Sequence, residues 1–368
     1  MNNNYIKLLI FFLISFFLLT PILIIFFQGL YSINNVNELY APRYIFGSSK
    51  LIFLVSFVVL LISVPLAWLN TMTNFWGRKF IQIFCILPLG VPAFISAYAY
   101  AEILEPGGYL SIYFSNFYGF SIRNTFFASI ILGLSLFPYV YLLTRIAIIN
   151  FSARFIEAAK TMGKSPWQCF FKICLPMAIP GIAAGLALAL METINDFGVA
   201  DFFGLQTLTI GVFQYISVIN DLPSAFSLSL IILIIMLLLY IFEQKMRGDK
   251  QFNNSSYESI QWSRYQLSKR KTILVFSLSF LPIFFGFFVP LLFNFFIFIN
   301  NYEIIDYSNY LSSLVNSMIL GSLVGFFCIL VSIFINFYSR FSRNKKFLYY
   351  KKIINLGYAV PGVVIALG

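Results

Sequence analysis

Residues 157–176 have the sequence EAAKTMGKSPWQCFFKICLP, a moderately polar passage set between two long apolar runs. Gly163 allows a sharp turn inside this passage that a side chain would obstruct. Ser165 and Pro166 follow as a capping hydroxyl and a proline at the first helical position, so a helix is predicted to begin there. We therefore expect two short helices that meet at an angle and form a knob that a soluble partner could grip.

The first of these helices is predicted to start at Ser152, whose hydroxyl can cap it. Phe155, Ala159 and Met162 are spaced to lie together on one of its faces. An ordinary cytoplasmic loop lying along a membrane surface would have the same spacing. The spacing alone therefore leaves both interpretations open.

The composition places the chain among membrane proteins, because hydrophobic residues make up 60% of it and charged residues only 10%. A helix needs about 20 apolar residues to cross the hydrocarbon core of a bilayer. Such runs lie at residues 8–30, 50–69, 80–103, 125–149, 177–198, 225–243, 272–299 and 314–338, and a further run begins near 349. The expected fold is an all-α polytopic membrane protein. No small-residue cleavage site follows the first run, which is expected to be a retained helix.

The basic residues decide the expected orientation. Lys and Arg gather in alternate connections, around residues 78–79, 145–172, 245–271 and 340–352, whereas the other connections hold only Arg43, Lys50 and Arg123. The positive-inside rule then places the N-terminus and residues 157–176 in the cytoplasm. The net charge of +11 is explained by this asymmetry and by contact with anionic membrane lipids, so no nucleic acid partner is needed.

A shift of 269 residues aligns similar segments in the two halves of the chain. Residues 54–63 (LVSFVVLLIS) fall on residues 323–332 (LVGFFCILVS), and residues 87–93 (LPLGVPA) fall on residues 356–362 (LGYAVPG). An even number of predicted helices separates the matched segments. We therefore expect parallel repeats, related by an axis along the membrane normal.

This repeat gives the expected domain organisation. The parts are an N-terminal helix with an outer loop (1–47), a first transmembrane domain (48–248), a polar cytoplasmic linker (249–271) and the start of a second transmembrane domain (272–368). The second copy ends inside its third helix. The chain is therefore expected to be a C-terminally truncated piece of a fused protein with two such domains.

Several kinds of chemistry are missing from the sequence. The chain has no histidine, and so no histidine base or histidine metal ligand. Gly163-Lys164-Ser165 looks like the end of a phosphate-binding P-loop, but Ala158 stands where that motif needs glycine. Four cysteines without C-x-x-C spacing are expected to be free thiols: Cys85, Cys169, Cys174 and Cys328. We expect a non-enzyme without a bound cofactor.

Polar residues near the outer end of the fifth predicted helix are candidates for a translocation pathway. Glu192, Asn195 and Asp196 share a helical face through their i, i+3, i+4 spacing. Carboxylates at that depth are costly unless they face a cavity or a partner. They could hold neighbouring helices or a docked protein in place, or they could touch the substrate.

No firm metal site follows from the sequence. Glu192 and Asp196 are candidate transient ligands for a hard cation, which prefers oxygen. The other oxygen-bearing candidates near the entrance are Glu102, Glu105, Tyr98 and Tyr100.

Small residues and prolines mark further positions. Gly181, Gly185 and Ala189 form a ladder of small side chains that would let another helix approach closely. Prolines are expected to break the third helix and its counterpart in the second half, at Pro88, Pro92 and Pro361. Such breaks can line a pathway or simply be packing kinks.

Residues 157–176 closely resemble the EAA loop of the membrane subunits of bacterial ATP-binding-cassette importers, and we use that name for them. The family pattern has Glu-Ala-Ala, a glycine four residues later and an apolar run that ends in Leu-Pro. The matching positions are Glu157, Ala158, Ala159, Gly163, Ile173, Leu175 and Pro176. The resemblance implies that the loop couples the chain to an ATPase, and that the fold is the type I transmembrane fold of these importers.

Further segments narrow the resemblance to the fused permeases of ferric-iron importers. Residues 137–145 (FPYVYLLTR), 192–198 (ETINDFG) and 203–209 (FGLQTLT) are similar to those permeases, and the resemblance covers most of 48–368. It implies a periplasmic ferric-ion-binding protein, a cytoplasmic ATPase dimer that uses the ATP, and a place in the bacterial inner membrane. The missing second EAA loop departs from the family pattern.

Other functions stay open at this point. Related permeases carry thiamine, phosphonates, sulfate or polyamines, so the resemblance does not fix the substrate. A secondary transporter would also have basic inner loops, internal repeats and broken helices. Such a transporter would be expected to carry acidic residues in mid-membrane, whereas the acids of this chain cluster near the ends of the predicted helices.

Overall fold

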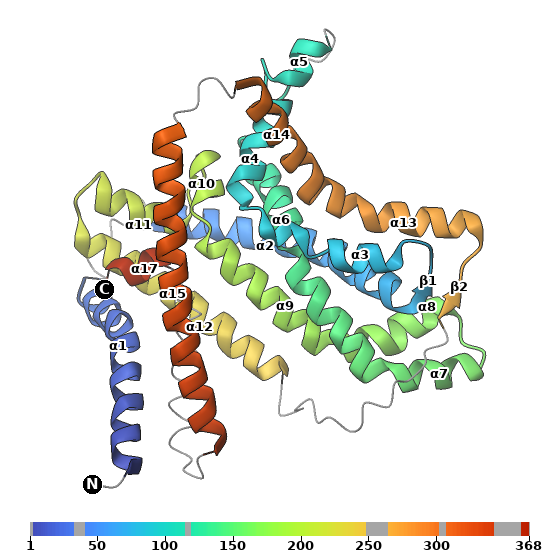
Figure 1. Cartoon of the computed structure of the whole chain (residues 1–368), viewed down its shortest axis with the longest axis horizontal. Coiled ribbons are helices and arrows are strands. Elements are labelled where there is room, and N and C mark those ends of the chain that lie inside the picture. Colours follow the sequence, from blue (N-terminus) through green and yellow to red (C-terminus); the bar gives the residue numbers. More distant parts are fainter. Residues whose placement is uncertain are drawn as a thin grey trace.

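The computed structural model of the chain describes residues 3–32, 41–114, 119–247, 264–301, 307–341 and 362–367. Figure 1 shows that these stretches are almost entirely helical. Among them, 6 helices are long and apolar enough to cross a membrane, or up to 7 if a bent pair counts as one span. The chain is an all-α multi-pass membrane protein, as its composition predicts.

Three long helices form the centre of the first half. They are α2 (Ala41–Met72), α6 (Thr125–Ala147) and α9 (Leu175–Asn195), which pack on one another around a shared apolar core. A second packed group contains α1 (Asn3–Ser32), α11 (Leu208–Ser217) and α12 (Leu222–Arg247). Five of the six long apolar runs predicted in this half are helices: α1, α2 and α12 are longer than predicted, and α6 and α9 are slightly shorter. α11 is an additional short apolar helix.

The predicted span at 80–103 is not one straight helix, which corrects the prediction. The chain forms α3 (Arg78–Phe84), a 3-10 turn (Leu87–Gly90), α4 (Ala93–Leu104) and the short α5 (Tyr109–Tyr113). The two parts of this pair are bent by 90°. Pro88 lies in the 3-10 turn and Pro92 is the N-cap residue of α4, and a proline cannot donate the backbone hydrogen bond of a continuous helix. The predicted break at these prolines is confirmed.

Two long helices pass through a π-helical turn that the sequence did not indicate. One runs from α8 (Pro166–Cys169) through Phe170–Cys174 into α9, and the other from α13 (Lys269–Ile283) through Phe284–Phe288 into α14 (Val289–Asn301). Pro176 and Pro290 follow just after these turns. The wider turn accommodates a proline, which lacks an N–H and would crowd the preceding turn of a regular helix. The second short helix predicted for the EAA loop is therefore the first part of a helix that continues to Asn195.

Two short strands connect the first half to the segment before α13. β1 (Thr73–Asn74) comes directly after α2, and β2 (Tyr265–Gln266) comes just before α13. The strands pair in parallel, with Thr73 opposite Tyr265. β2 lies within the predicted linker, residues 249–271, and the sequence did not indicate this pairing.

The described residues include two further helices of the second half. α15 (Tyr307–Phe341) and α17 (Gly362–Leu367) follow α14. The segments that the offset of 269 residues matches, 54–63 and 323–332, lie within α2 and α15, so both are helical. The same offset carries Ala93 of α4 onto Gly362 of α17. Pro361 lies outside the described residues, and the division into four domains stays a prediction.

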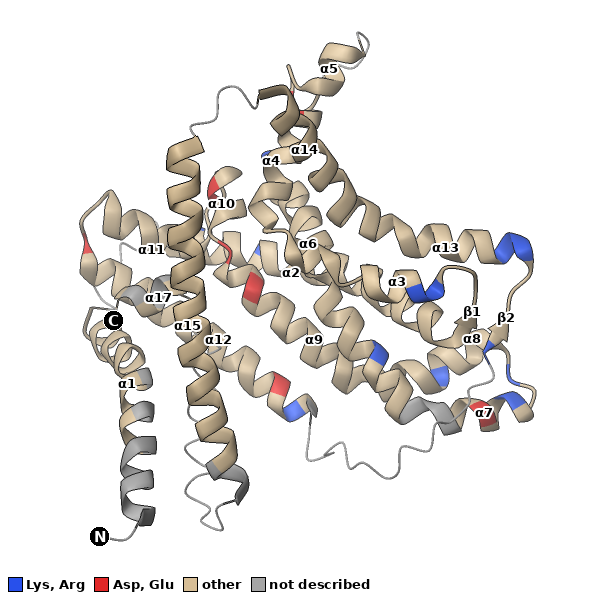
Figure 2. Ribbon diagram, in the orientation of Figure 1, with Lys and Arg blue, Asp and Glu red and all other residues tan. Residues whose placement is uncertain are grey.

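The basic and acidic residues separate in space. Figure 2 shows that blue segments gather at α3, at α7, on either side of α8 and at the start of α13, while red segments lie on α9, α10 and the connection between α11 and α12. Single acidic segments on α7 and near the end of α12 are exceptions. We call the side that holds α3, α7, α8 and the start of α13 the basic end. Within the described residues, the basic residues of α3, the EAA loop and the start of α13 thus lie together, and residues 342–352 of the fourth predicted basic connection lie outside the described residues.

Candidate functional site

The chain enters the EAA loop without a break in the helix. α7 (Ala153–Thr161) continues from α6 through a π-helical turn, Ile148–Ser152. The prediction that a new helix starts at Ser152 with a capping hydroxyl is therefore wrong. Because the backbone stays helical through the π turn, no set of free N–H groups arises there for a cap to satisfy.

The buried face of α7 also differs from the prediction. Ile156 and Ala159 are buried, whereas Phe155 and Met162 are exposed. A π turn holds one more residue than an α turn, and the extra residue rotates the following helix about its axis. Phe155 and Met162 therefore face away from the protein instead of joining Ala159 in the core.

The turn after α7 has the geometry that the glycine predicts. Gly163 has φ 73°, in the left-handed region that favours glycine. Its N–H donates to the carbonyl of Lys160 at 3.0 Å, and the N–H of Lys164 donates to the carbonyl of Ala159 at 3.0 Å. These two hydrogen bonds form a Schellman motif, which satisfies carbonyls at the end of the helix. The predicted sharp turn is confirmed.

The start of α8 is confirmed as well. The Ser165 hydroxyl accepts a hydrogen bond from the backbone N–H of Gln168 at 3.3 Å. In return, the Gln168 side-chain oxygen accepts from the backbone N–H of Ser165 at 3.1 Å, which completes a capping box, and Pro166 occupies the first helical turn. The EAA loop therefore has a fixed backbone on both sides of Gly163.

The EAA loop presents large apolar side chains on its surface. Met162 is 75% exposed and Trp167 is 71% exposed, and Phe171 in the loop and Phe155 just before it are exposed too. The Trp167 and Phe171 rings stack with centroids 6.0 Å apart. The positions of the family pattern itself are mixed, with Ala159 buried, Glu157 and Leu175 half-buried, and Ala158 and Pro176 exposed. Exposed apolar groups of this size mark contact sites or membrane-facing surface.

A contact between the EAA loop and the linker was missed from the sequence. Lys160 Nζ lies 4.2 Å from the centroid of the Tyr265 ring. Burial lowers the pKa of Lys160, and the nearby Glu157 carboxylate opposes this shift. Burial and the neighbouring Cys169 thiol raise the pKa of the Tyr265 phenol. Tyr265 is one of 22 tyrosines in the chain, and no motif around it distinguishes it from the others.

The polar cluster at the end of α9 is arranged differently from the prediction. Glu192 and Asn195 lie in the last turn of α9, but the helix ends at Asn195 and Asp196 adopts an extended conformation. The Asp196 carboxylate accepts a hydrogen bond from the backbone N–H of Val199 at 2.7 Å, at the start of α10 (Gly198–Phe202). The three residues therefore do not share one helical face, because Asp196 serves the turn into α10.

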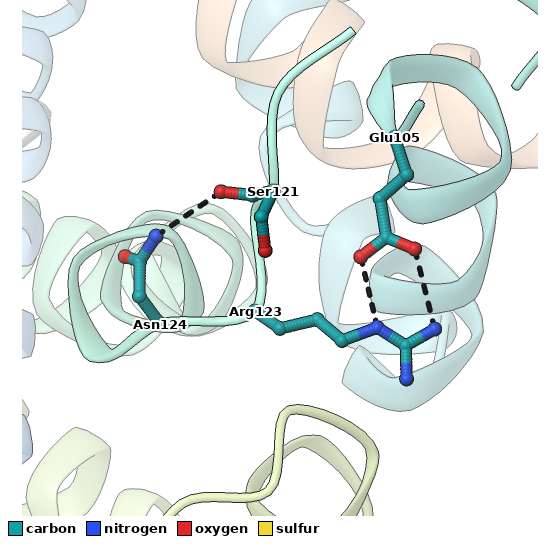
Figure 3. Close-up of polar contacts among 4 residues, drawn as sticks. All are labelled: Glu105, Ser121, Arg123 and Asn124. Atoms are coloured by element: carbon teal, nitrogen blue, oxygen red, sulfur yellow. Dashed lines mark hydrogen bonds and ion pairs between the residues drawn. The ribbon is translucent and has the colours of Figure 1, made fainter. Parts of the chain in front are cut away.

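A neighbouring carboxylate is engaged in an ion pair. Figure 3 shows Arg123 pointing toward Glu105, and its Nε and Nη2 donate to the two carboxylate oxygens at 2.9 and 3.2 Å. These hydrogen bonds raise the pKa of the Arg123 guanidinium. The guanidinium carbon also lies 5.1 Å from the centroid of the Phe202 ring in α10. Both oxygens of Glu105 are thus committed to joining α4, the start of α6 and α10.

Two further candidate oxygen ligands have packing roles. The Tyr100 hydroxyl donates to the carbonyl of Phe285 at 2.6 Å, which ties α4 to the π turn between α13 and α14. Tyr98 packs edge-on against Phe202, with ring centroids 6.2 Å apart. Within the described residues, no group of three His, Cys, Asp or Glu side chains could hold a metal ion. Glu192 is the carboxylate of the predicted pathway cluster that remains on α9.

The small residues of α9 lie where α9 meets α6. A Cβ added to Gly181 would come 2.6 Å from the Cβ of Ala147, and one added to Gly185 would come 2.6 Å from the Cα of Val140. Ala189, one step further along, is fully buried. The close approach of the two backbones depends on the missing side chains.

The first pair of candidate prolines lies beside the second half of the chain. Pro88 is buried, and a Cβ added to Gly286 in the π turn Phe284–Phe288 would come 3.5 Å from the Pro88 Cβ. Pro92 is exposed. The 3-10 turn at Pro88 therefore has a packing role against the second half, and a role of either proline in lining a pathway stays a prediction.

Comparison with known proteins adds a family match. Residues 60–248 match the family described as "Binding-protein-dependent transport system inner membrane component". The molybdenum transport system permease protein ModB of Haemophilus influenzae is 29% identical over 165 residues, which is 42% of this chain and 71% of that protein. The spermidine/putrescine transport system permease protein PotB of the same organism is 29% identical over 227 residues, 55% of this chain and 79% of that protein.

One similar protein aligns with both halves of the chain. The Fe(3+)-transport system permease protein FbpB 2 of Haemophilus influenzae is 25% identical over 306 residues, which is 82% of this chain. The aligned part is 57% of FbpB 2, so the chain spans little more than half the length of that relative.

Proposed function

The chain belongs to the family of binding-protein-dependent transport system inner membrane components, and we propose that it is the permease subunit of an ATP-driven importer for ferric iron. In this proposal the chain forms part of the translocation pathway. A separate ATPase dimer hydrolyses the ATP, and the EAA loop, residues 157–176, transmits the resulting movement. A periplasmic binding protein delivers the substrate.

The shape of the EAA loop carries this proposal. Its backbone is fixed by the Schellman motif at Gly163 and the capping box at Ser165. Met162, Trp167 and their apolar neighbours are nevertheless exposed instead of packing on the bundle. A rigid knob with large apolar side chains fits a groove on a protein partner, because ordered side chains lose little conformational entropy on binding.

The charge distribution supports a cytoplasmic position for this knob. The EAA loop lies at the basic end, together with α3 and the start of α13 (Figure 2). Basic connections are retained on the cytoplasmic side of bacterial membranes and interact there with anionic lipids. The ATPase would then meet the EAA loop from the cytoplasm, and the binding protein would meet the opposite face, near α10 and the Glu105–Arg123 ion pair.

The extent of the similarity favours ferric iron as the substrate. The alignment with FbpB 2 covers 82% of the chain, against 42% for ModB and 55% for PotB. Molybdate is the second candidate, because ModB is 29% identical where it aligns. Sulfate and polyamine permeases are also among the similar proteins. The family match leaves no support for the alternative of a secondary transporter without an ATPase.

Copurification and ligand analysis test the proposal. We expect a cytoplasmic ATPase to copurify with the full-length protein, and the binding protein encoded beside its gene to retain ferric ion. Metal analysis of that binding protein distinguishes iron from molybdenum. Isolation of the full-length protein without any ATPase, under conditions that keep it folded, would overturn the proposed importer. A molybdate-loaded binding protein would overturn only the choice of substrate.

The pathway residues give a separate prediction. We expect Glu192→Gln to lower transport per docked binding protein by about tenfold, because a weak oxygen ligand near the entrance lowers the barrier for a passing cation. Asp196→Asn should stay close to wild type, because its amide oxygen can still accept the hydrogen bond from Val199.

Flux and docking are measured separately to check this prediction. Binding-protein affinity and substrate uptake are determined for both variants in proteoliposomes. Loss of docking by Glu192→Gln with unchanged flux per docked complex would remove the ion-handling role and leave a structural one.

A further inference from the structure

The linker that leads into the second half ends on the surface of the EAA loop. β2 pairs with β1 through two residues on each strand, and the Asn74 amide donates to the Gln266 side-chain oxygen at 3.2 Å. Only Leu267 and Ser268 separate β2 from α13. Two extended residues span about 7 Å. Because this connection is short, a shift of β2 would also move α13.

Tyr265 is the residue of this strand that contacts the EAA loop. Its ring faces the ammonium of Lys160 from α7, with 4.2 Å between Nζ and the ring centroid. Its hydroxyl is buried beside the thiol of Cys169 from α8. One side chain thus touches both helices of the EAA loop, on either side of the turn at Gly163.

The partners of Tyr265 are themselves held firmly. Cys169 is fully buried, and Phe170 beside it packs against Trp68 of α2 with ring centroids 5.2 Å apart. Cation–π attraction strengthens when the cation is partly removed from water, and Lys160 is half-buried. The contact therefore joins packed elements and not two mobile surface groups.

We propose that Tyr265 is a positioning residue for coupling, which fixes the linker strand to the EAA loop so that the loop and α13 move together. This inference rests on the proposed function of the EAA loop in coupling to an ATPase. It adds that the EAA loop of the first half acts on the second half directly, through β2, and not only through the helices of its own domain.

A reversible cross-link tests the contact itself. Tyr265→Cys is introduced into the complete importer with Cys85, Cys174 and Cys328 changed to serine, which leaves the native Cys169 as its partner. We expect ATP hydrolysis stimulated by the loaded binding protein to fall by about fivefold in the reduced protein, because the positioning contact is lost. Joining the two thiols with a short bifunctional thiol reagent should restore it to within about twofold of the parent.

Single substitutions separate positioning from folding. Tyr265→Phe should be close to wild type, because the hydroxyl makes no well-formed hydrogen bond in the described part of the chain. The Tyr265→Ala importer should bind the ATPase normally but lose the stimulation of ATP hydrolysis by the loaded binding protein. Lys160→Gln should lose part of this stimulation. Tyr240→Ala on α12 is the matched control, because Tyr240 is also a half-buried tyrosine but lies outside this contact. If Tyr265→Ala does not fold, the comparison of Tyr265→Phe with Lys160→Gln tests the proposal instead.

The outcomes distinguish this inference from the proposed function. A wild-type importer that binds no ATPase would refute the proposed function. A wild-type importer that is stimulated normally, together with full stimulation in Tyr265→Ala, would refute the role of Tyr265 alone. Failure of the two thiols to cross-link, or loss of activity on cross-linking, would also refute it, because the contact would then be absent or would have to open during the cycle.

Discussion

Gly163→Pro is expected to abolish the stimulation, by the loaded binding protein, of the ATP hydrolysis that the partner ATPase performs. The chain should still insert into the membrane. Proline cannot adopt the φ of 73° found at Gly163. It also lacks the N–H that donates to the carbonyl of Lys160. Loss of this backbone conformation and of this hydrogen bond destabilises the turn by about 3 kcal/mol. This is enough to unfold the turn between α7 and α8. The bundle should survive, because a Cβ at Gly163 would meet nothing within 4 Å.

The test compares Gly163→Pro with three further variants in reconstituted vesicles. Gly163→Ala keeps the N–H and should cost only about 1 kcal/mol for the left-handed conformation, so partial stimulation is expected. Gly107→Pro is the matched control, because Gly107 also has a positive φ, of 82°, and open space around it but lies away from the EAA loop. Glu157→Lys should also lose stimulation. Unchanged stimulation in Gly163→Pro would rule out a coupling role for the turn.

Gly185→Leu should cause a large loss of stability. The first added carbon would lie 2.6 Å from the Cα of Val140 and 2.9 Å from the carbonyl oxygen of Tyr139. These are backbone atoms of α6, which cannot rotate away as a side chain does. Overpacking of this kind costs about 3 kcal/mol, a large share of the stability of a folded domain. The thermal unfolding midpoint of the purified protein should fall by about 10 °C.

Gly325→Leu provides the control for this substitution. Gly325 also lies within a long helix, α15, but a Cβ there would meet nothing within 4 Å. The thermal midpoint of Gly325→Leu should therefore stay close to that of the wild type. Equal destabilisation by both substitutions would show that the contact of α9 with α6 does not account for the effect, because Gly→Leu raises helix propensity at both sites.

The parts of the fold that were predicted from the sequence are those decided by neighbouring residues. Long apolar runs fix where helices cross the membrane, since backbone groups in lipid must be satisfied within the helix. The turn at Gly163 and the capping box at Ser165 depend on residues within a few positions of each other. The helix break at Pro88 and Pro92 was indicated by two prolines four residues apart, whereas the single prolines Pro65, Pro138 and Pro180 lie inside continuous helices.

The parts that were not predicted depend on residues far apart in the chain. The ring of Tyr265 meets Lys160 only because β2 pairs with β1. Asp196 looked like a helical residue by spacing, but the turn into α10 uses its carboxylate. Glu105 looked like a free acid, but Arg123 takes both of its oxygens. For the candidate site, the sequence indicated the position and backbone of the EAA loop, but not which of its side chains are exposed.

The two π-helical turns, Ile148–Ser152 and Phe170–Cys174, lie on either side of α7 and α8. A π turn can revert to an α turn by passing on its extra residue, and this rotates the adjoining helix by about 100° without breaking the helix as a whole. The EAA loop is thus connected to α6 and α9 through two turns at which the helix can rotate. Movement of the EAA loop would first change the helix rotation at these two turns. Their resistance to this rotation determines how far α6 and α9 move.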